Sequence, residues 1–363
     1  MIRVLHMIGS LNMGGSQTMI MNLYRHMDKK QIQFDFIIDH PGQLYFADEI
    51  KDMGGRIFLL PLFKGGNLVQ IRKAWNTFFN EHPEYKILHS HVRSYASIYF
   101  PIAKKHGLIT IIHSHSTSNG SGFTALAKRI LQYPLRFQAD YFFGCSKIAG
   151  EWLFGREIVH SNRYYMIQNA IDCNLYRMDQ DIRDRFRNEI HAGNQIVFGH
   201  VGRFHTAKNH EFLLEVFSYI HKRMGESQLV IVGDGDLRKL IENKISELKL
   251  QDSVVLVGMK PNVNELLQAM DCFLFPSKWE GLPVTVVEAQ AAGLPCFVSD
   301  TVTQDVCLSE LVTYLSIDQG VEVWGDKILH SDLTRKNVSA DIIQSGFDIA
   351  ASCTWLTDFY QSL

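Results

Sequence analysis

Short apolar runs alternate with amphipathic stretches along most of the chain. The apolar runs are rich in Val, Ile, Leu and Phe and end in glycine or polar residues, which is typical of buried parallel strands. The stretches between them repeat apolar residues at three- and four-residue spacing, which predicts amphipathic helices. The alternation predicts an α/β fold of the doubly wound kind, with helices on both faces of parallel sheets.

The first half of the chain contains one series of these strands and helices. Strands are predicted at 3–8, 34–38, 56–60, 87–91, 109–115, 140–146 and 164–167. The loop after the first strand contains Gly14 and Gly15, and glycine lets backbone N–H groups approach a phosphate closely. A tight turn between strand and helix is the plainer interpretation of this loop.

Two strands of this half end in His-Ser-His, at 89–91 and 113–115. Residues i and i+2 of a strand share a face, so each pair of histidines points the same way. A metal site is one interpretation, but no carboxylate or cysteine clusters near these histidines in the sequence. We therefore expect the first histidine of each pair to be structural and the second, His91 or His115, to face a ligand.

A strongly charged segment from 175 to 194 separates the two halves and is expected to be a solvated linker with a helix. A second series of strands follows at 195–201, 227–233, 254–258, 272–275, 296–299 and 311–315. The chain then ends in predicted helices at 321–329, 333–345 and 350–363, of which the last has an apolar face. The predicted domains are 1–185 and 186–345, followed by a terminal helix at 346–363.

Candidate chemistry is concentrated in the second series. Arg203 and Lys208 follow its first strand, where they can neutralise a diphosphate or simply be solvated surface cations. Glu280 and Glu288 flank the start of the helix that follows the strand at 272–275. Because a helix N-terminus favours an anion, two acids beside it indicate a ligand with both phosphates and hydroxyls, such as a nucleotide-sugar.

Composition narrows the classes of protein. Hydrophobic residues make up 46% of the chain, charged residues 20%, and the net charge is −2, so nothing global indicates a nucleic-acid partner. The apolar run at the N-terminus is too short for a signal peptide, and the six scattered cysteines are expected to be free thiols in the cytoplasm. A basic amphipathic stretch at 124–137 is either an anionic-membrane contact or an ordinary surface helix broken at Pro134.

The ordered motifs of the second half resemble the retaining GT-B glycosyltransferases of family 4, the group 1 glycosyltransferases. The resemblance spans nearly the whole chain and is strongest in these motifs: Gly202-Arg203, Lys208-Asn209, Val232-Gly233-Asp234-Gly235, Phe275-Pro276-Ser277, Glu280-Gly281-Leu282-Pro283, Glu288-Ala289 and Gly293-Leu294-Pro295. It implies two Rossmann-like domains facing across a cleft, the first binding the acceptor and the second binding the nucleotide-sugar donor. It also implies that the last helix crosses back onto the first domain.

The resemblance assigns roles to single residues. Arg203 and Lys208 match the pair that grips the donor diphosphate, Glu288 matches the acid on the ribose, and Glu280 matches the acid near the transferred sugar. His115 is the better match to the histidine near the reacting end of that sugar. The other implied donor-binding residues are Gly14, Gly15, Gly258, Lys260, Gly281 and Leu282.

The resemblance also implies the reaction. It is transfer of a hexose or N-acetylhexosamine from a nucleotide-sugar, expected to be UDP-linked, with retention and with neither metal nor cofactor. The polysaccharide-assembly branch is favoured, with a lipid-linked or growing polysaccharide acceptor, as in capsule or exopolysaccharide synthesis. Peripheral contact with the cytoplasmic face of the inner membrane is then expected.

Two departures from the family pattern are Ala170, where Gly usually follows Asn169, and Asn209 after Lys208. Neither removes a charge. Two other functions remain as alternatives, a GT-B-like nucleotide-sugar 2-epimerase and a non-catalytic partner subunit of a glycosyltransferase. The basic pair together with both acids argues against each of them.

Overall fold

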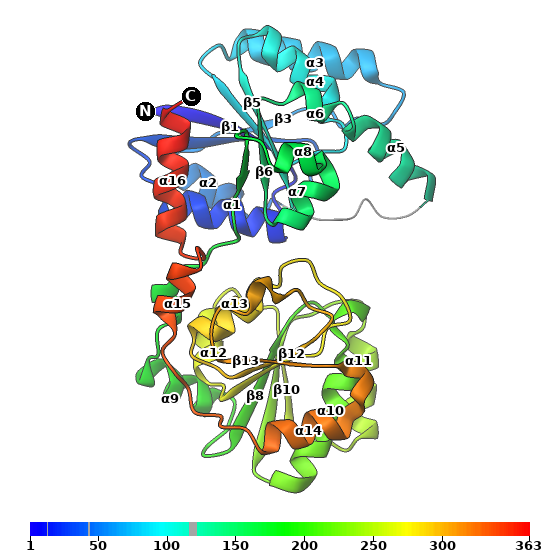
Figure 1. The fold of residues 1–363 in the computed structure, drawn as a ribbon, viewed down its shortest axis with the longest axis vertical. Coiled ribbons are helices and arrows are strands. Elements are labelled where there is room, and N and C mark those ends of the chain that lie inside the picture. Colours follow the sequence, from blue (N-terminus) through cyan, green and yellow to red (C-terminus); the bar gives the residue numbers. More distant parts are fainter. Residues whose placement is uncertain (13, 43, 116–121) are drawn as a thin grey trace. The chain divides into compact units, whose positions relative to one another are not determined.

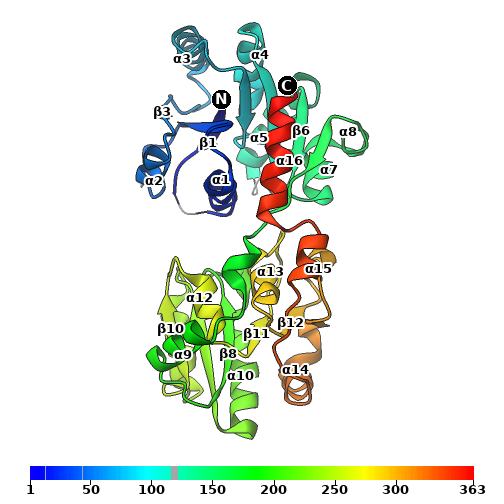
Figure 2. The ribbon, with the colours of Figure 1, turned by 90° about the vertical axis from the view of Figure 1, so that its left-hand side faces the viewer.

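The computed structural model describes residues 1–12, 14–42, 44–115 and 122–363. The described chain divides into two compact units (Figures 1 and 2). The first unit contains Met1–Ala170 together with Ile349–Leu363, and the second contains Ile171–Asp348. Each unit has a parallel sheet with helices on both faces.

Among the described residues, the first unit contains a seven-stranded parallel sheet of order β3-β2-β1-β4-β5-β6-β7. Its strands are β1 (Ile2–Gly9), β2 (Ile32–Ile38), β3 (Ile57–Leu59), β4 (Ile87–Ser90), β5 (Ile109–Ser114), β6 (Tyr141–Gly144) and β7 (Tyr164–Met166). The inner strands are buried on both faces, which explains their continuous apolar runs, whereas the edge strands β3 and β7 are only partly buried.

The helices of this unit form two layers over the sheet. They are α1 (Gly15–His26), α2 (Ala47–Asp52), α3 (Leu68–Glu81), α4 (Ala96–Lys105), α5 (Gly122–Gln132), α6 (Leu135–Gln138), α7 (Lys147–Phe154), α8 (Arg156–Val159) and α16 (Ile349–Gln361). The α1 and α16 side chains share one apolar core, and α3 and α4 share the other. As predicted, Pro134 interrupts the helical stretch, here between α5 and α6.

The last helix, α16, belongs to the first unit although the preceding segment belongs to the second. Its buried side chains recur at helical spacing and include Cys353, Leu356 and Tyr360. The helix lies beside α1 (Figure 2). The hydroxyl of Tyr360 is hydrogen-bonded to Nδ1 of His89 in β4, at 2.7 Å. The helix therefore completes the core of the first unit.

Replacing Leu356 with alanine should destabilise the first unit by about 3 kcal/mol, because a buried leucine loses transfer energy and leaves a cavity. Urea unfolding followed by near-UV circular dichroism would measure the change. Thr354→Ala, at an exposed position of the same helix, is the matched control. Equal midpoints for the two variants would contradict this role of α16.

In the described part of the second unit, a six-stranded parallel sheet has the order β10-β9-β8-β11-β12-β13. Its strands are β8 (Ile196–Val201), β9 (Ser227–Val232), β10 (Val254–Gly258), β11 (Cys272–Phe275), β12 (Cys296–Ser299) and β13 (Val312–Leu315). Its α-helices are α9 (Gln180–Glu189), α10 (His210–Met224), α11 (Arg238–Glu247), α12 (Val263–Gln268), α13 (Val284–Ala291), α14 (Gly320–Leu329) and α15 (Ser339–Gln344).

The structure differs from three expectations about the second unit. The units divide between residues 170 and 171, whereas the predicted boundary at 185 lies inside α9. The charged segment is not a free linker, because Arg183 and Arg187 of α9 both bind Asp271, at 2.5 and 3.1 Å. The predicted helix at 333–345 is confined to α15, and the preceding residues use their backbone and Arg335 to hold Gly293 and Ala292.

Candidate active site

The strand order of each sheet reverses direction once. In the second unit, the candidate residues lie at this reversal. The reversal lies between β8 and β11, whose carboxyl ends therefore diverge and leave a crevice. Lys208 follows β8 and Glu280 follows β11. Their side chains meet there, with Nζ of Lys208 2.8 Å from Oε1 of Glu280.

The Lys208–Glu280 pair is largely shielded from water. The two side chains are 16% and 15% exposed, and Nζ of Lys208 lies 4.5 Å from the ring centroid of Phe275. Gly202 makes room for the lysine, because a Cβ atom at this position would lie 3.0 Å from Cε of Lys208. In so shielded a site the Coulomb attraction between the two charges is stronger than at the surface, and Glu280 fixes the position of the cation.

Glu280 lies in the loop between β11 and α13, together with Gly281 and Leu282. The backbone N–H of Lys278 donates to the carbonyl of Ala207 at 2.7 Å, which ties this loop to the segment that carries Lys208. Pro283 precedes the first residue of α13, where its missing N–H breaks no helical hydrogen bond. The loop therefore delivers Glu280 beside a helix N-terminus, a favourable position for an anion.

Glu288, on α13, receives a hydrogen bond of 2.8 Å from the hydroxyl of Tyr176. Burial raises the pKa of this carboxyl above its ordinary value, and the hydrogen bond from Tyr176 opposes the rise. Tyr176 was not identified from the sequence. It follows the first residues of the unit, and no local motif marks it as the partner of an acid more than a hundred residues away.

Arg203 has a different environment from Lys208. Its side chain is 70% exposed and its guanidinium lies 3.4 Å from the carboxylate of Asp236. Asp234 accepts from the backbone of Gly235 and from Arg238, so both acids of the Asp234-Gly235-Asp236 loop have partners in the protein. Gly258 ends β10 and Lys260 is exposed two residues later.

The predicted residues of the first unit lie at the carboxyl edge of its own sheet. Gly14 precedes α1 and Gly15 begins it. His115 follows β5 and is partly exposed, whereas His113 is 1% exposed. Burial lowers the pKa of His115 to about 3, with a smaller contribution from Arg93, so the imidazole is neutral near pH 7.

Five histidines gather around this position, one more than the two His-Ser-His motifs indicated. Nδ1 of His91 lies 2.8 Å from Nε2 of His115, and Nε2 of His91 lies 3.0 Å from Nδ1 of His6. In two groups, ring nitrogens approach within 4.8 Å of one another: His6, His89 and His91, and His91, His113 and His115. Imidazole is a common transition-metal ligand, so these are the described residues best able to hold a metal.

Comparison with known proteins decides the family. The chain is 32% identical over 368 residues to the putative glycosyltransferase EpsF of Bacillus subtilis, with 99% of this chain and 96% of the relative covered. The chain belongs to the group 1 glycosyltransferases of family 4. Residues 181–331 match the model described as glycosyl transferases group 1, and residues 13–175 match the model of glycosyltransferase family 4.

Another relative and a solved structure support the same family and fold. The UDP-Gal:alpha-D-GlcNAc-diphosphoundecaprenol alpha-1,3-galactosyltransferase of Escherichia coli is 24% identical, with 99% of this chain and 96% of the relative covered. The crystal structure of Anabaena Alr3699/HepE in complex with UDP and glucose superimposes with a TM-score of 0.79, at 17% identity and with both chains covered completely. The predicted family and GT-B fold are thereby confirmed, while the role of each site residue stays a prediction.

None of the helices in the described ranges of this glycosyltransferase combines the length and apolar character required to span a bilayer.

Proposed function

We propose that this glycosyltransferase moves a hexose or N-acetylhexosamine, with retention and without a metal, from a UDP-sugar to a lipid-linked or growing polysaccharide acceptor. The enclosed Lys208–Glu280 pair at the reversal of the second sheet carries the proposal. In the proposal, Lys208 is a fixed cation for the donor diphosphate and Glu280, beside it, is an acid for the sugar. Glu288, held by Tyr176, would accept hydrogen bonds from the ribose hydroxyls.

Sugar transfer requires a positive charge beside the leaving diphosphate, and Lys208 would supply it. The bond between the sugar and the diphosphate breaks while negative charge grows on the leaving group. A preformed cation in a shielded site lowers the energy of that transition state without reorganisation during the reaction. The new bond forms to an acceptor hydroxyl, whose proton passes to an oxygen of the departing phosphate. The neutral His115 would then act as a hydrogen-bonding group for the sugar rather than as a cation.

The proposed classes of donor and acceptor are based on the names of two relatives. The Escherichia coli enzyme has a UDP-sugar donor and a diphosphoundecaprenol-linked acceptor, and another relative, of Staphylococcus aureus, is a capsular polysaccharide biosynthesis glycosyltransferase. The same reaction class in this chain would serve capsule or exopolysaccharide synthesis.

A panel of nucleotide-sugars tests the proposal, first by thermal shift and then by transfer to lipid-linked saccharides. Transfer with retained configuration at the sugar C1 is the expected result. Inversion at C2 of the free donor would instead indicate an epimerase. A folded chain that neither binds nor transforms any donor would indicate a non-catalytic subunit.

Treatment with EDTA should leave the transfer rate within about twofold of the untreated rate, because protein cations replace a metal at the leaving group. The rate before and after removal of the chelator, together with metal analysis, checks this. A loss that zinc restores would instead point to the histidine groups around His91.

Attachment to the inner membrane is proposed through α5 and the residues after it. Leu126, Ile130, Tyr133 and Phe137 recur on one side and are 56%, 65%, 58% and 75% exposed. Of the basic residues in this stretch, Lys128 and Arg129 are exposed, whereas Arg136 donates to the carbonyl of Leu153 at 3.2 Å.

Changing Leu126 and Phe137 together to serine should reduce co-sedimentation with anionic vesicles by about 10-fold, because buried apolar area supplies much of interfacial binding. Val69→Ser removes a still more exposed apolar residue from α3 and is the control. Unchanged sedimentation of the double variant would exclude this surface as the anchor.

A further inference from the structure

A small internal cavity of about 10 Å³ lies in the first unit, beside the histidine cluster described above. Four of the five histidines line it: His6 of β1, His89 of β4, His91 directly after β4, and His113 of β5. Apart from these rings and Tyr360, the residues around it are apolar. A cavity of this size has room for one water molecule or one metal ion.

Several ring nitrogens of these histidines lack the hydrogen bonds that buried polar atoms normally make. Nε2 of His6, Nε2 of His89 and both nitrogens of His113 have no partner among the residues that the structure describes. The three residues are 2%, 2% and 1% exposed. Because an unpaired buried polar atom is costly, these nitrogens favour an occupant of the cavity that binds several of them at once.

The rings are already close enough to share one ion. One nitrogen from each of His6, His89 and His91 lies within 4.8 Å of the others, and Nδ1 of His6 is 3.0 Å from Nε2 of His91. Two imidazole ligands of a tetrahedral zinc ion would be about 3.3 Å apart, because each Zn–N bond is about 2.0–2.1 Å. Small rotations of the side chains would therefore bring the nitrogens to ligand distances.

Tyr360 orients one of these rings. Its hydroxyl is hydrogen-bonded to Nδ1 of His89, so Nε2 is the nitrogen left for a metal. A hydrogen bond on the second nitrogen is the usual support of a metal-binding histidine. Burial lowers the pKa of His6, His89 and His113, so these rings are neutral near pH 7, and the neutral ring is the form that binds a metal.

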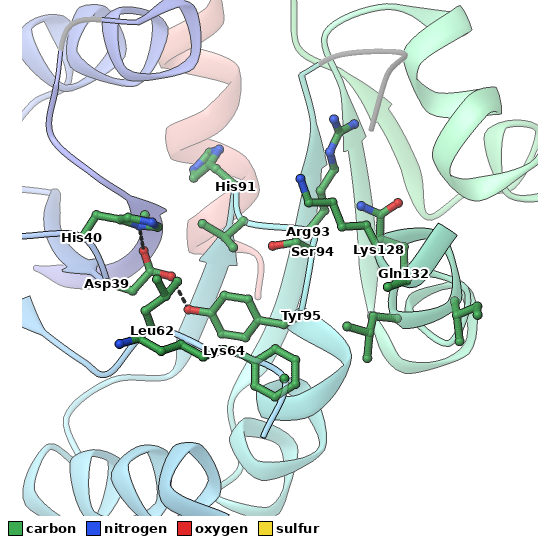
Figure 3. Close-up of a pocket in the computed structure, with 17 residues that line it drawn as sticks. Asp39, His40, Leu62, Lys64, His91, Arg93, Ser94, Tyr95, Lys128 and Gln132 are labelled. Atoms are coloured by element: carbon green, nitrogen blue, oxygen red, sulfur yellow. Dashed lines mark hydrogen bonds and ion pairs between the residues drawn. The ribbon is translucent and has the colours of Figure 1, made fainter. Parts of the chain in front are cut away.

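His91 connects the internal cavity to the surface of the unit. Its side chain lines the internal cavity and also an open cavity of about 960 Å³, whose wall includes Asp39, Lys64 and Lys128 (Figure 3). His91 is partly exposed. An ion could therefore enter past this one side chain.

The ligand types limit the kind of ion. Imidazole suits zinc and copper, and Met19 of α1, which also lines the cavity, offers a thioether that favours Cu⁺. Within the described ranges, the groups of side chains here that could hold a metal contain only histidine. Mg²⁺ and Ca²⁺ require oxygen ligands and do not fit such a set.

We propose that His6, His89, His91 and His113 bind a single transition-metal ion, Zn²⁺ or Cu⁺, in the core of the first unit. Through these residues the ion connects β1, β4 and β5, and through Tyr360 it also supports α16. The site is structural and takes no part in sugar transfer, so it does not depend on the proposed function.

The test uses the untagged full chain, stripped of metal with EDTA and then loaded with Zn²⁺ or, under nitrogen with ascorbate, with Cu⁺. At least one of the two ions should remain bound at about one per chain after gel filtration, as measured by elemental analysis. At about 100 times its dissociation constant, that ion should raise the melting temperature of the first unit by about 5 °C or more. Retention of neither ion would overturn the inference and leave the cavity to a water molecule.

His89→Asn removes the ligand nitrogen but keeps a donor for Tyr360, because the amide nitrogen of asparagine lies where Nδ1 lies in histidine. It should weaken ion binding by about 10-fold or more and remove the rise in melting temperature. His330→Asn is the matched control, since His330 is exposed after α14 and its Nδ1 is hydrogen-bonded to the carbonyl of Asp326 at 2.7 Å. The control should change the affinity by less than about twofold. Wild-type affinity in a folded His89→Asn chain would overturn the inference.

Tyr360→Phe decides the case in which His89→Asn does not fold. It keeps every imidazole and should weaken ion binding by about 10–100-fold, while the stoichiometry stays at about one ion per chain. An unchanged affinity in that case would overturn the inference. If removal of the ion stopped sugar transfer in a chain that stays folded, the metal-free reaction proposed above would be contradicted and the ion site would not.

Discussion

Replacing Lys208 with methionine should lower kcat/KM for sugar transfer by about 10²–10³, the usual loss when one preformed charge-stabilising contact is removed. Methionine keeps most of the side-chain volume over Phe275 and removes only the charge. The loss should appear in kcat more than in KM for the donor, since leaving-group charge is greatest in the transition state. Initial rates with a saturating acceptor would measure it.

Lys278→Met is the matched control. Lys278 lies two residues from Glu280 and is exposed, and it forms no ion pair among the residues that the structure describes. Its rate should remain within about twofold of the wild-type rate. A folded Lys208→Met variant with a normal rate would show that the leaving group is stabilised elsewhere.

Replacing Glu288 with glutamine should weaken UDP binding by about 10–100-fold, because hydrogen bonds to a charged acceptor contribute about 1.5–3 kcal/mol each. In the proposed role the ionised carboxylate is the form that binds, and burial raises the pKa of Glu288. UDP affinity of the wild type should therefore fall as the pH drops through this raised pKa. Calorimetry across about pH 5–8 would follow the fall.

The raised pKa of Glu288 also determines how the folding stability of the protein changes with pH. Because the pKa of Glu288 is higher in the folded than in the unfolded chain, the ionised carboxylate opposes folding at a pH above both values. That cost disappears as the pH falls through the folded pKa. Glu288→Gln should accordingly be no less stable than the wild type at pH 7, which separates lost binding from lost folding in a melting experiment.

Tyr176→Phe separates a positioning role from a purely structural one. The hydrogen bond from Tyr176 lowers the pKa of Glu288, so its removal should move the loss of UDP affinity to higher pH. A variant that binds UDP with the wild-type pH profile would contradict this role.

Many strands and helices could be predicted because each depends on a local sequence pattern. Buried parallel strands are apolar along their whole length, and glycine and proline mark their ends, so β11, α13 and the stop at Gly293 follow from sequence. The apolar spacing of α16 predicted a helix that must pack on something. Its assignment to the first unit came from the family resemblance.

The errors concern charged segments. Arg183 and Arg187 looked solvated in sequence, and they instead bind Asp271, which brings α9 into the second unit. Sequence patterns describe the polarity of a residue but not its distant partner. The domain boundary was misplaced for this reason.

The sequence by itself determined the two series of strands and helices, the ordered motifs and thus the family, because each depends on neighbouring residues or fixed spacings. Only the tertiary structure decided that Lys208 contacts Glu280, that Tyr176 holds Glu288, and that Asp39, Lys64 and Lys128 line one cavity. These groups come from different strand ends. The strand order of the parallel sheets brings them together, and no local spacing in the chain encodes that order.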